Sequence, residues 1–115
     1  MPREFPRNVR IAENIKRLLA EPLMRAGRDA GCGMLTVTRV IVASDLTTAR
    51  VLVSAFPGQL TKAQLDSLKH QRAPMRSVIA RDLRLKKVPT IFFEIDDSIA
   101  NAARIGELLN DTPRA

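Results

Sequence analysis

Two runs of β-branched residues, separated by a short turn-forming segment, constrain the fold of this 115-residue chain most strongly. The runs are residues 36–42 and 49–55, and residues of this type favour extended strands. Ser44-Asp45-Leu46-Thr47 lies between them and has the composition of a turn. Two strands joined by so short a connection pair antiparallel. The sequence therefore predicts a β-hairpin.

Apolar residues at helical spacing precede this hairpin, in residues 7–19. We expect Pro22 to end or kink the helix, because proline lacks the N–H donor and clashes with the preceding turn. Three glycines then predict a loop before the first strand. The helical stripe consists of Ile11, Ala12, Ile15, Leu18 and Leu19, and the glycines are Gly27, Gly31 and Gly33.

Two helices separated by a kink are predicted after the hairpin. Thr61-Lys62-Ala63-Gln64 has the sequence of a capping box, flanked by leucines placed for a hydrophobic staple, so a helix is expected from residue 61 to about residue 72. Pro74 cannot continue that helix but suits the first turn of a new one, which runs to about residue 85. The predicted kink consists of Gln71, Arg72, Ala73 and Pro74.

Residues 88–95 predict a third strand, with Pro89 near its start, where a missing donor is tolerated. Asp97 or Ser98 can cap a last helix over residues 99–109. The expected order is α-β-β-α-kink-α-β-α in one domain, 1–115, with about 7–109 ordered between a short basic arm and a short tail. Three strands with helices on one face make a two-layer α+β sandwich.

The charge of the chain favours a polyanionic partner. Lys and Arg number 19 against 12 acidic residues, giving a net charge of +7. Most of the basic residues are Arg, whose flat fork of donors suits phosphate, so we expect nucleic acid. The absence of Trp and Tyr counts against modules that stack bases on aromatic platforms.

Cysteine and histidine usage limits the possible chemistry. Cys32 is the single cysteine, which rules out an intramolecular disulfide and a cysteine-based metal site and fits a reducing cytosol. His70 is the single histidine, which rules out a metal site with several histidines. No partner base is visible for Cys32, and His70 stands in a polar stretch. No apolar run is long enough for a membrane span. We expect a chain without catalytic residues, metal or cofactor, and no membrane or small-molecule partner.

The strongest functional signal is the basic segment 72–87, in which only Asp82 is acidic. At about 100° per residue, Arg76, Arg81 and Arg84 lie roughly opposite the stripe of Met75 and Ile79. A solvated helix face is the alternative, but such faces usually carry both signs. The segment therefore predicts a surface that follows phosphates. The predicted RNA-binding residues are Arg72, Arg76, Arg81, Arg84, Lys86 and Lys87, together with Arg7 and Arg10 near the N-terminus.

Other functions stay open on the residues alone. Glu94, Asp96 and Asp97 at the end of the third strand suit Mg²⁺ in an RNA nuclease, although helix capping by Asp97 is the favoured interpretation. A helix-turn-helix DNA-binding protein using the helices around Pro74 is the main rival. A third alternative is a pure protein-interaction module, in which the charge serves only recruitment.

Several segments together have the pattern of one known family. They are Arg10-Ile11-Ala12-Glu13-Asn14-Ile15, Met34-Leu35-Thr36-Val37-Thr38, Arg81-Asp82-Leu83-Arg84-Leu85-Lys86-Lys87-Val88-Pro89 and Asp96-Asp97-Ser98-Ile99. With these segments, nearly the whole chain resembles the ribosome-binding factor A family of bacterial small-subunit assembly factors.

The resemblance implies a type II KH-like domain, α-β-β-α-kink-α-β, with an added C-terminal helix. KH domains clamp the nucleic-acid backbone with a Gly-x-x-Gly loop, which this family replaces by an Ala-x-Gly kink. The matching positions here are Gln71-Arg72-Ala73, followed by Pro74. Pro74 is expected to break the helix in the absence of glycine, and Arg72 to supply a phosphate contact.

The resemblance also implies a function. It predicts a non-enzymatic, cytoplasmic and monomeric factor that binds free 30S ribosomal subunits. Such a factor assists late maturation of 16S rRNA, near the 5′-terminal helix region of that RNA.

Overall fold

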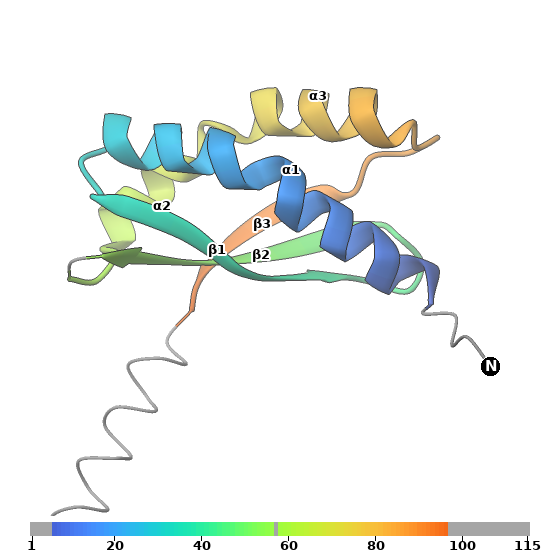
Figure 1. Ribbon diagram of the computed structural model, residues 1–115, viewed down its shortest axis with the longest axis horizontal. Helices are drawn as coiled ribbons and strands as arrows, with labels where there is room; N and C mark the ends of the chain where they lie inside the picture. Colours follow the sequence, from blue (N-terminus) through green and yellow to red (C-terminus); the bar gives the residue numbers. More distant parts are fainter. Residues whose placement is uncertain (1–5, 57, 97–115) are drawn as a thin grey trace, which may run out of the picture.

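The computed structural model describes residues 6–56 and 58–96 of the chain (Figure 1). The element order follows the predicted order as far as the third strand, and the predicted helix 99–109 with its caps Asp97 and Ser98 lies outside the described residues. The elements are α1 (Arg7–Asp29), β1 (Met34–Val42), β2 (Thr48–Phe56), α2 (Lys62–Lys69), α3 (Arg72–Leu83) and β3 (Thr90–Ile95).

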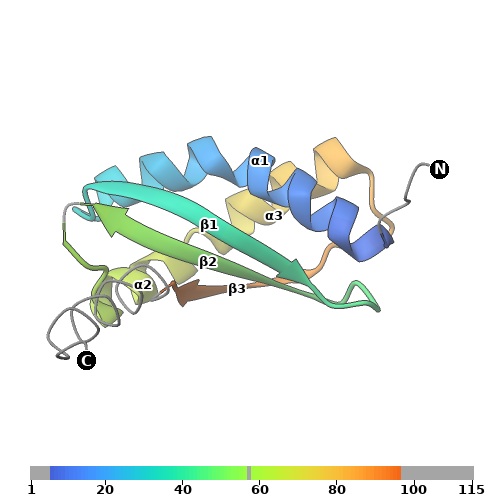
Figure 2. The same ribbon diagram turned by 60° about the horizontal axis from the view of Figure 1, so that its bottom comes forward.

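The three strands form one sheet in the order β1-β2-β3. β1 and β2 are the predicted antiparallel hairpin, whereas β3 runs parallel to β2. Parallel strands need a long crossover, and α2 with α3 supplies it. In Figures 1 and 2, α1 and α3 lie side by side over one face of the sheet, so the two-layer α+β sandwich is confirmed.

A β-bulge keeps the apolar side chains of β1 on one face. Leu35 and Val37 are buried before it and Val40 and Val42 after it, an alternation that shifts by one residue. The shift in register falls at Thr38, between Val37 and Arg39. Because side chains alternate along a strand, an unbulged β1 would turn half of these residues to solvent. The strand prediction contained no bulge.

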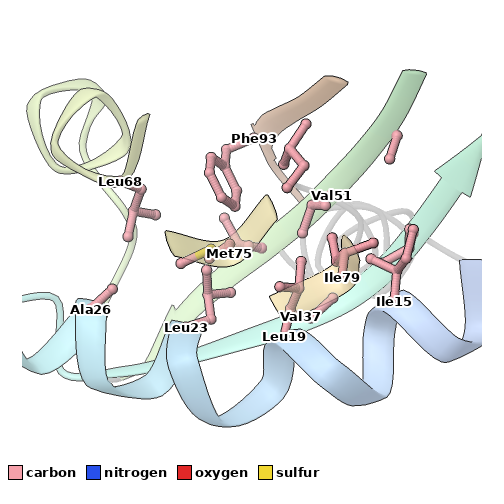
Figure 3. Packing of buried hydrophobic residues seen from close by; sticks show 14 of the residues in the cluster. Ile15, Leu19, Leu23, Ala26, Val37, Val51, Leu68, Met75, Ile79 and Phe93 are labelled. Carbon is pink, nitrogen blue, oxygen red and sulfur yellow. The ribbon is translucent and has the colours of Figure 1, made fainter. Parts of the chain in front are cut away.

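The core lies between the helices and the sheet (Figure 3). On α1, the predicted stripe is confirmed at Ile11, Ala12, Ile15 and Leu19, which are buried, but not at Leu18, which is half-buried. Leu23, beyond the predicted helix, is fully buried as well. Met75 and Ile79 of α3 pack against the same cluster. The sheet contributes Leu35, Val37, Val40, Val42, Ala49, Val51, Val53, Ile91 and Phe93.

Pro22 was predicted to end or kink α1, and the first of these alternatives is wrong. The helix continues through Pro22 to Asp29, although proline in a helix interior costs about 3 kcal/mol. Beyond Pro22, Leu23 and Ala26 are buried against the core, and this burial offsets the missing hydrogen bond. Gly31 and Gly33 do form the predicted loop, with φ of +73° and +69°, values that favour glycine.

Gly27 belongs to α1 rather than to the loop, and it allows α1 to approach β1 closely. A Cβ atom at this position would lie 2.6 Å from the Cβ of Leu35. We predict that Gly27→Ala destabilises the protein by about 1–3 kcal/mol, because the helix must move away from the strand. Urea unfolding measures this loss. Gly31→Ala is the control for steric contact, because no neighbouring atom lies within 4 Å of the position of the added Cβ. Any loss of stability in this variant comes from the positive φ of residue 31 alone.

The break between the helices lies earlier than predicted. The capping box at Thr61 is confirmed, but α2 ends at Lys69 and α3 already begins at Arg72. The break is therefore His70 and Gln71, and Pro74 stands in the first turn of α3. A first-turn residue has no intrahelical acceptor for its N–H, so proline is tolerated there.

Candidate nucleic-acid interface

The outer face of α3 carries exposed cations, as its sequence predicted. Met75 and Ile79 are buried, whereas Arg76 and Arg81 are exposed. Arg81 makes one contact with the neighbouring Asp82, from Nε to Oδ1 at 3.3 Å. That pair is solvent-exposed and therefore weak. The Arg81 guanidinium keeps most of its donors for another partner.

The loop after α3 extends this cationic surface. Arg84 adopts a left-handed conformation, with φ of +50°, and ends the helix. Lys86 and Lys87 follow and are exposed, while Pro89 is fully buried and fixes the end of the loop. Cations near a helix C-terminus are also favoured by the helix dipole.

The start of α1 lies at the same end of the molecule. The Asn8 side chain donates to the Val42 carbonyl at 3.0 Å, which ties α1 to the end of β1. The β1–β2 turn at this end carries Asp45, whose pKa is lowered mainly by hydrogen bonds from the Thr47 hydroxyl and N–H, with the charge of Lys87 as the smallest cause.

Figures 1 and 2 agree that the N-terminus of α1, the β1–β2 turn and the loop after α3 share this end. Six of the eight predicted RNA-binding residues therefore come together there. We call this set the basic end, and it consists of Arg7, Arg10, Arg81, Arg84, Lys86 and Lys87, all of them exposed.

The other two predicted residues contact the backbone. Arg72 donates from Nε to the Lys69 carbonyl at 3.2 Å and from Nη1 to the Ile91 carbonyl at 3.3 Å. It thereby connects the α2–α3 break to β3. Arg76 donates to the Val88 carbonyl at 3.5 Å. Arg72 stands at the start of α3, away from the basic end, with the remaining donors of its guanidinium fork available.

The acidic residues at the end of β3 have protein partners. Arg50 forms a bidentate ion pair with Glu94, in which Nε lies 2.5 Å from Oε2 and Nη2 lies 2.9 Å from Oε1. The Thr38 hydroxyl contacts the carboxylate of Asp96. Asp97 lies outside the described residues. Within residues 6–56 and 58–96, no three Asp, Glu, His or Cys side chains are grouped to hold a metal ion.

The Arg50–Glu94 pair has an electrostatic consequence. The hydrogen bond from Arg50 holds the pKa of Glu94 below its ordinary value of 4.5. A carboxyl with a depressed folded-state pKa stabilises the protein above its unfolded pKa and loses that contribution as pH falls through the folded value. The pair is partly exposed, so solvent screening keeps the contribution small.

A hollow that the sequence did not predict lies on the face of the sheet away from α1 and α3. Its volume is about 420 Å³ and it lies where β2 and β3 meet the α2–α3 break. The alternation of β3 was the available signal, because Phe92 stands between buried Ile91 and Phe93 and must face the other way. The lining residues are Thr48, Arg50, Lys69, Arg72, Phe92, Phe93 and Glu94.

Comparisons with known proteins identify the family. The profile of the family described as Ribosome-binding factor A matches residues 7–109. The chain belongs to the ribosome-binding factor A family. Ribosome-binding factor A of Hahella chejuensis is 36% identical, with 95% of this chain and 86% of the relative covered. Ribosome-binding factor A of Desulfitobacterium hafniense is 38% identical, with coverage of 90% and 83%.

Solved structures of ribosome-binding factor A share the fold. The crystal structure of the Thermus thermophilus protein has a TM-score of 0.65 at 26% identity, covering 76% of this chain and 94% of the other. A second similar structure is a homology model of the T. thermophilus factor, fitted into a cryo-electron microscopy map of a complex of that factor with 30S. Its TM-score is 0.64 at 27% identity, and the match covers 75% of this chain and 91% of the other. The KH-like fold that the resemblance implied is thereby confirmed.

Among residues 6–56 and 58–96, none of the three helices is both long and apolar enough to cross a bilayer.

Proposed function

We propose that this protein is a non-enzymatic assembly factor that binds the free 30S ribosomal subunit and assists late maturation of 16S rRNA, near the 5′-terminal helix region of that RNA. Membership of the ribosome-binding factor A family is the single observation that carries the proposal. The fitted T. thermophilus structure supports it, because that relative is described in a complex with 30S.

The basic end is the surface that we propose for RNA. Its six cations come from the start of α1, the end of α3 and the following loop, so they are spread over a broad, exposed surface. Contacts to phosphate position a protein on RNA without reading its sequence. Arg72 and Arg76 lie along α3 and extend this surface toward the α2–α3 break. The proposed site therefore recognises the shape and charge of folded RNA rather than a base sequence.

The break between α2 and α3 has a different structural basis from a glycine loop. Gln71 provides no side-chain cap to α3, and Ala73 and Pro74 are exposed beside it. Pro74 pre-sets the backbone of this first turn, while Arg72 fixes it to β3. We propose that the break positions the remaining donors of Arg72 toward phosphate, in place of the close backbone approach that glycine allows.

The family assignment and the contacts of the acidic residues weigh against the alternative functions. Glu94 is paired with Arg50, and Asp96 is contacted by Thr38, which disfavours a shared Mg²⁺ site. A helix-turn-helix protein would use α3 to read DNA, but the family is described as ribosome-binding. We propose that the protein acts as a cytoplasmic monomer, without cofactor or small-molecule substrate.

Co-sedimentation tests the proposed function. We predict that the protein migrates with free small subunits in a sucrose gradient of a lysate and is depleted from polysomes. Charge alone would bring the protein to every ribosomal particle, because all of them expose RNA phosphate. Equal occupancy of free small subunits and polysomes would contradict the proposal.

A further inference from the structure

The hollow beside Phe92 is a second candidate binding site, apart from the basic end. The Phe92 side chain is 45% exposed, on the sheet face that carries no helix among residues 6–56 and 58–96 (Figure 2). Phe92 is the register partner of Arg50 on the central strand. The chain has four Phe and no Trp or Tyr, and among the described residues Phe92 and Phe56 are its exposed aromatic side chains.

The cations around this ring contact neighbouring protein groups. Arg50 makes two contacts with Glu94, and Arg72 donates to the Ile91 carbonyl. Lys69 completes the set, and its ammonium lies 3.3 Å from Asp66. Of the lining residues, three are cationic and only Glu94 is anionic. The hollow therefore favours a negatively charged ligand that also presents an apolar, flat surface.

A nucleotide combines these two properties. Bases stack on aromatic side chains, and this contact tolerates any base because every base has a π-face. Phosphate suits the guanidinium and ammonium groups that line the hollow. The volume of about 420 Å³ lies in the range of roughly 300–1,000 Å³ that is usual for ligand pockets.

We propose that this hollow binds one unpaired nucleotide of RNA, with its base stacked on Phe92 and its phosphate beside Lys69 and Arg72. The Glu94 carboxylate can accept a hydrogen bond from the ribose 2′-hydroxyl or from an amino group of the base. The inference rests on the proposed RNA-binding function and deepens it. α3 is 12 residues long, about 18 Å, so the hollow at its start is separate from the basic end.

Fluorescence of a single introduced tryptophan tests the proposal. Phe92→Trp gives the chain its only Trp, and we expect a single-stranded RNA hexanucleotide to quench its emission as a base stacks on the indole. Phe56→Trp is the matched control, because Phe56 is 72% exposed at the end of β2 and does not line the hollow. Equal quenching at the two positions would overturn the proposal, as would equal quenching of Phe92→Trp by the single strand and by an RNA duplex of the same length.

Affinity for the hexanucleotide gives a second measurement with native-like side chains. Phe92→Leu keeps an apolar residue on the strand, and it should weaken binding about tenfold, since aromatic stacking is lost. Phe56→Leu should bind like the wild type. If Phe92→Leu binds as tightly as the wild type while the wild type still co-sediments with small subunits, the nucleotide site is wrong and the proposed function stands. A wild type that binds neither the hexanucleotide nor small subunits would overturn both.

Discussion

Removing three cations from the basic end should weaken RNA binding by about 50- to 150-fold at 0.15 M salt. The variant combines Arg81→Gln, Arg84→Asn and Lys86→Gln, all at exposed positions. If each side chain neutralises one phosphate, the slope of log affinity against log salt should flatten by about 2 to 3 units. Asn at position 84 tolerates the left-handed backbone, so the fold should be unaffected.

The matched control removes three exposed cations from the opposite end of the molecule. Arg25, Arg28 and Lys62 lie near the end of α1 and the start of α2, and each is changed to Gln. This control changes the net charge by the same amount. Binding to small subunits at several salt concentrations compares the two variants. Equal losses would show that net charge alone drives binding and that the basic end is no specific surface.

Replacing Pro22 by Ala should stabilise the protein by about 1–3 kcal/mol. Pro22 lies inside α1, where it leaves the Leu18 carbonyl without its usual helical donor. Alanine restores this donor and removes the steric conflict with the preceding turn. Part of the gain is offset, because alanine increases the conformational entropy of the unfolded chain.

The free energy of unfolding in urea measures this gain, and Pro6→Ala provides the control. Pro6 is the residue before α1 and interrupts no helical hydrogen bond, yet its replacement has the same effect on the unfolded chain. Pro6→Ala should therefore not stabilise. A destabilising Pro22→Ala would contradict the account: it would mean that the backbone conformation imposed by proline is needed to bury Leu23 and Ala26.

Local sequence signals predicted most of the elements, because each depends on a few neighbouring residues. The Thr61 capping box is satisfied within four residues, and the hairpin follows from two strands and a short turn. Long-range packing decided the features that were missed. The path of α1 through Pro22 depends on burial of Leu23 and Ala26, and Gly27 is needed because Leu35 lies opposite it.

The sequence predicted which residues belong to the candidate site, but not how they are arranged in space. Segment 72–87 reveals its cations and its buried stripe, because both follow from helical spacing. The contact of Arg72 with the Ile91 carbonyl does not follow from spacing, since it depends on how α3 meets β3. The hollow beside Phe92 was missed for the same reason. It requires the parallel pairing of β3 with β2, which brings Phe92 beside Arg50.

Cleavage of RNA by a tethered radical source tests the central claim most directly. Cys32 is the only cysteine, it is buried, and burial raises the pKa of its thiol, so an introduced surface cysteine can be labelled selectively. An iron–EDTA group is attached through Lys86→Cys in the basic end or through Ala63→Cys on α2, both exposed positions. On free small subunits, we predict local cleavage of 16S rRNA from position 86 and little from position 63. Equal or stronger cleavage from position 63, or none from position 86, would contradict the basic end as the RNA-binding surface.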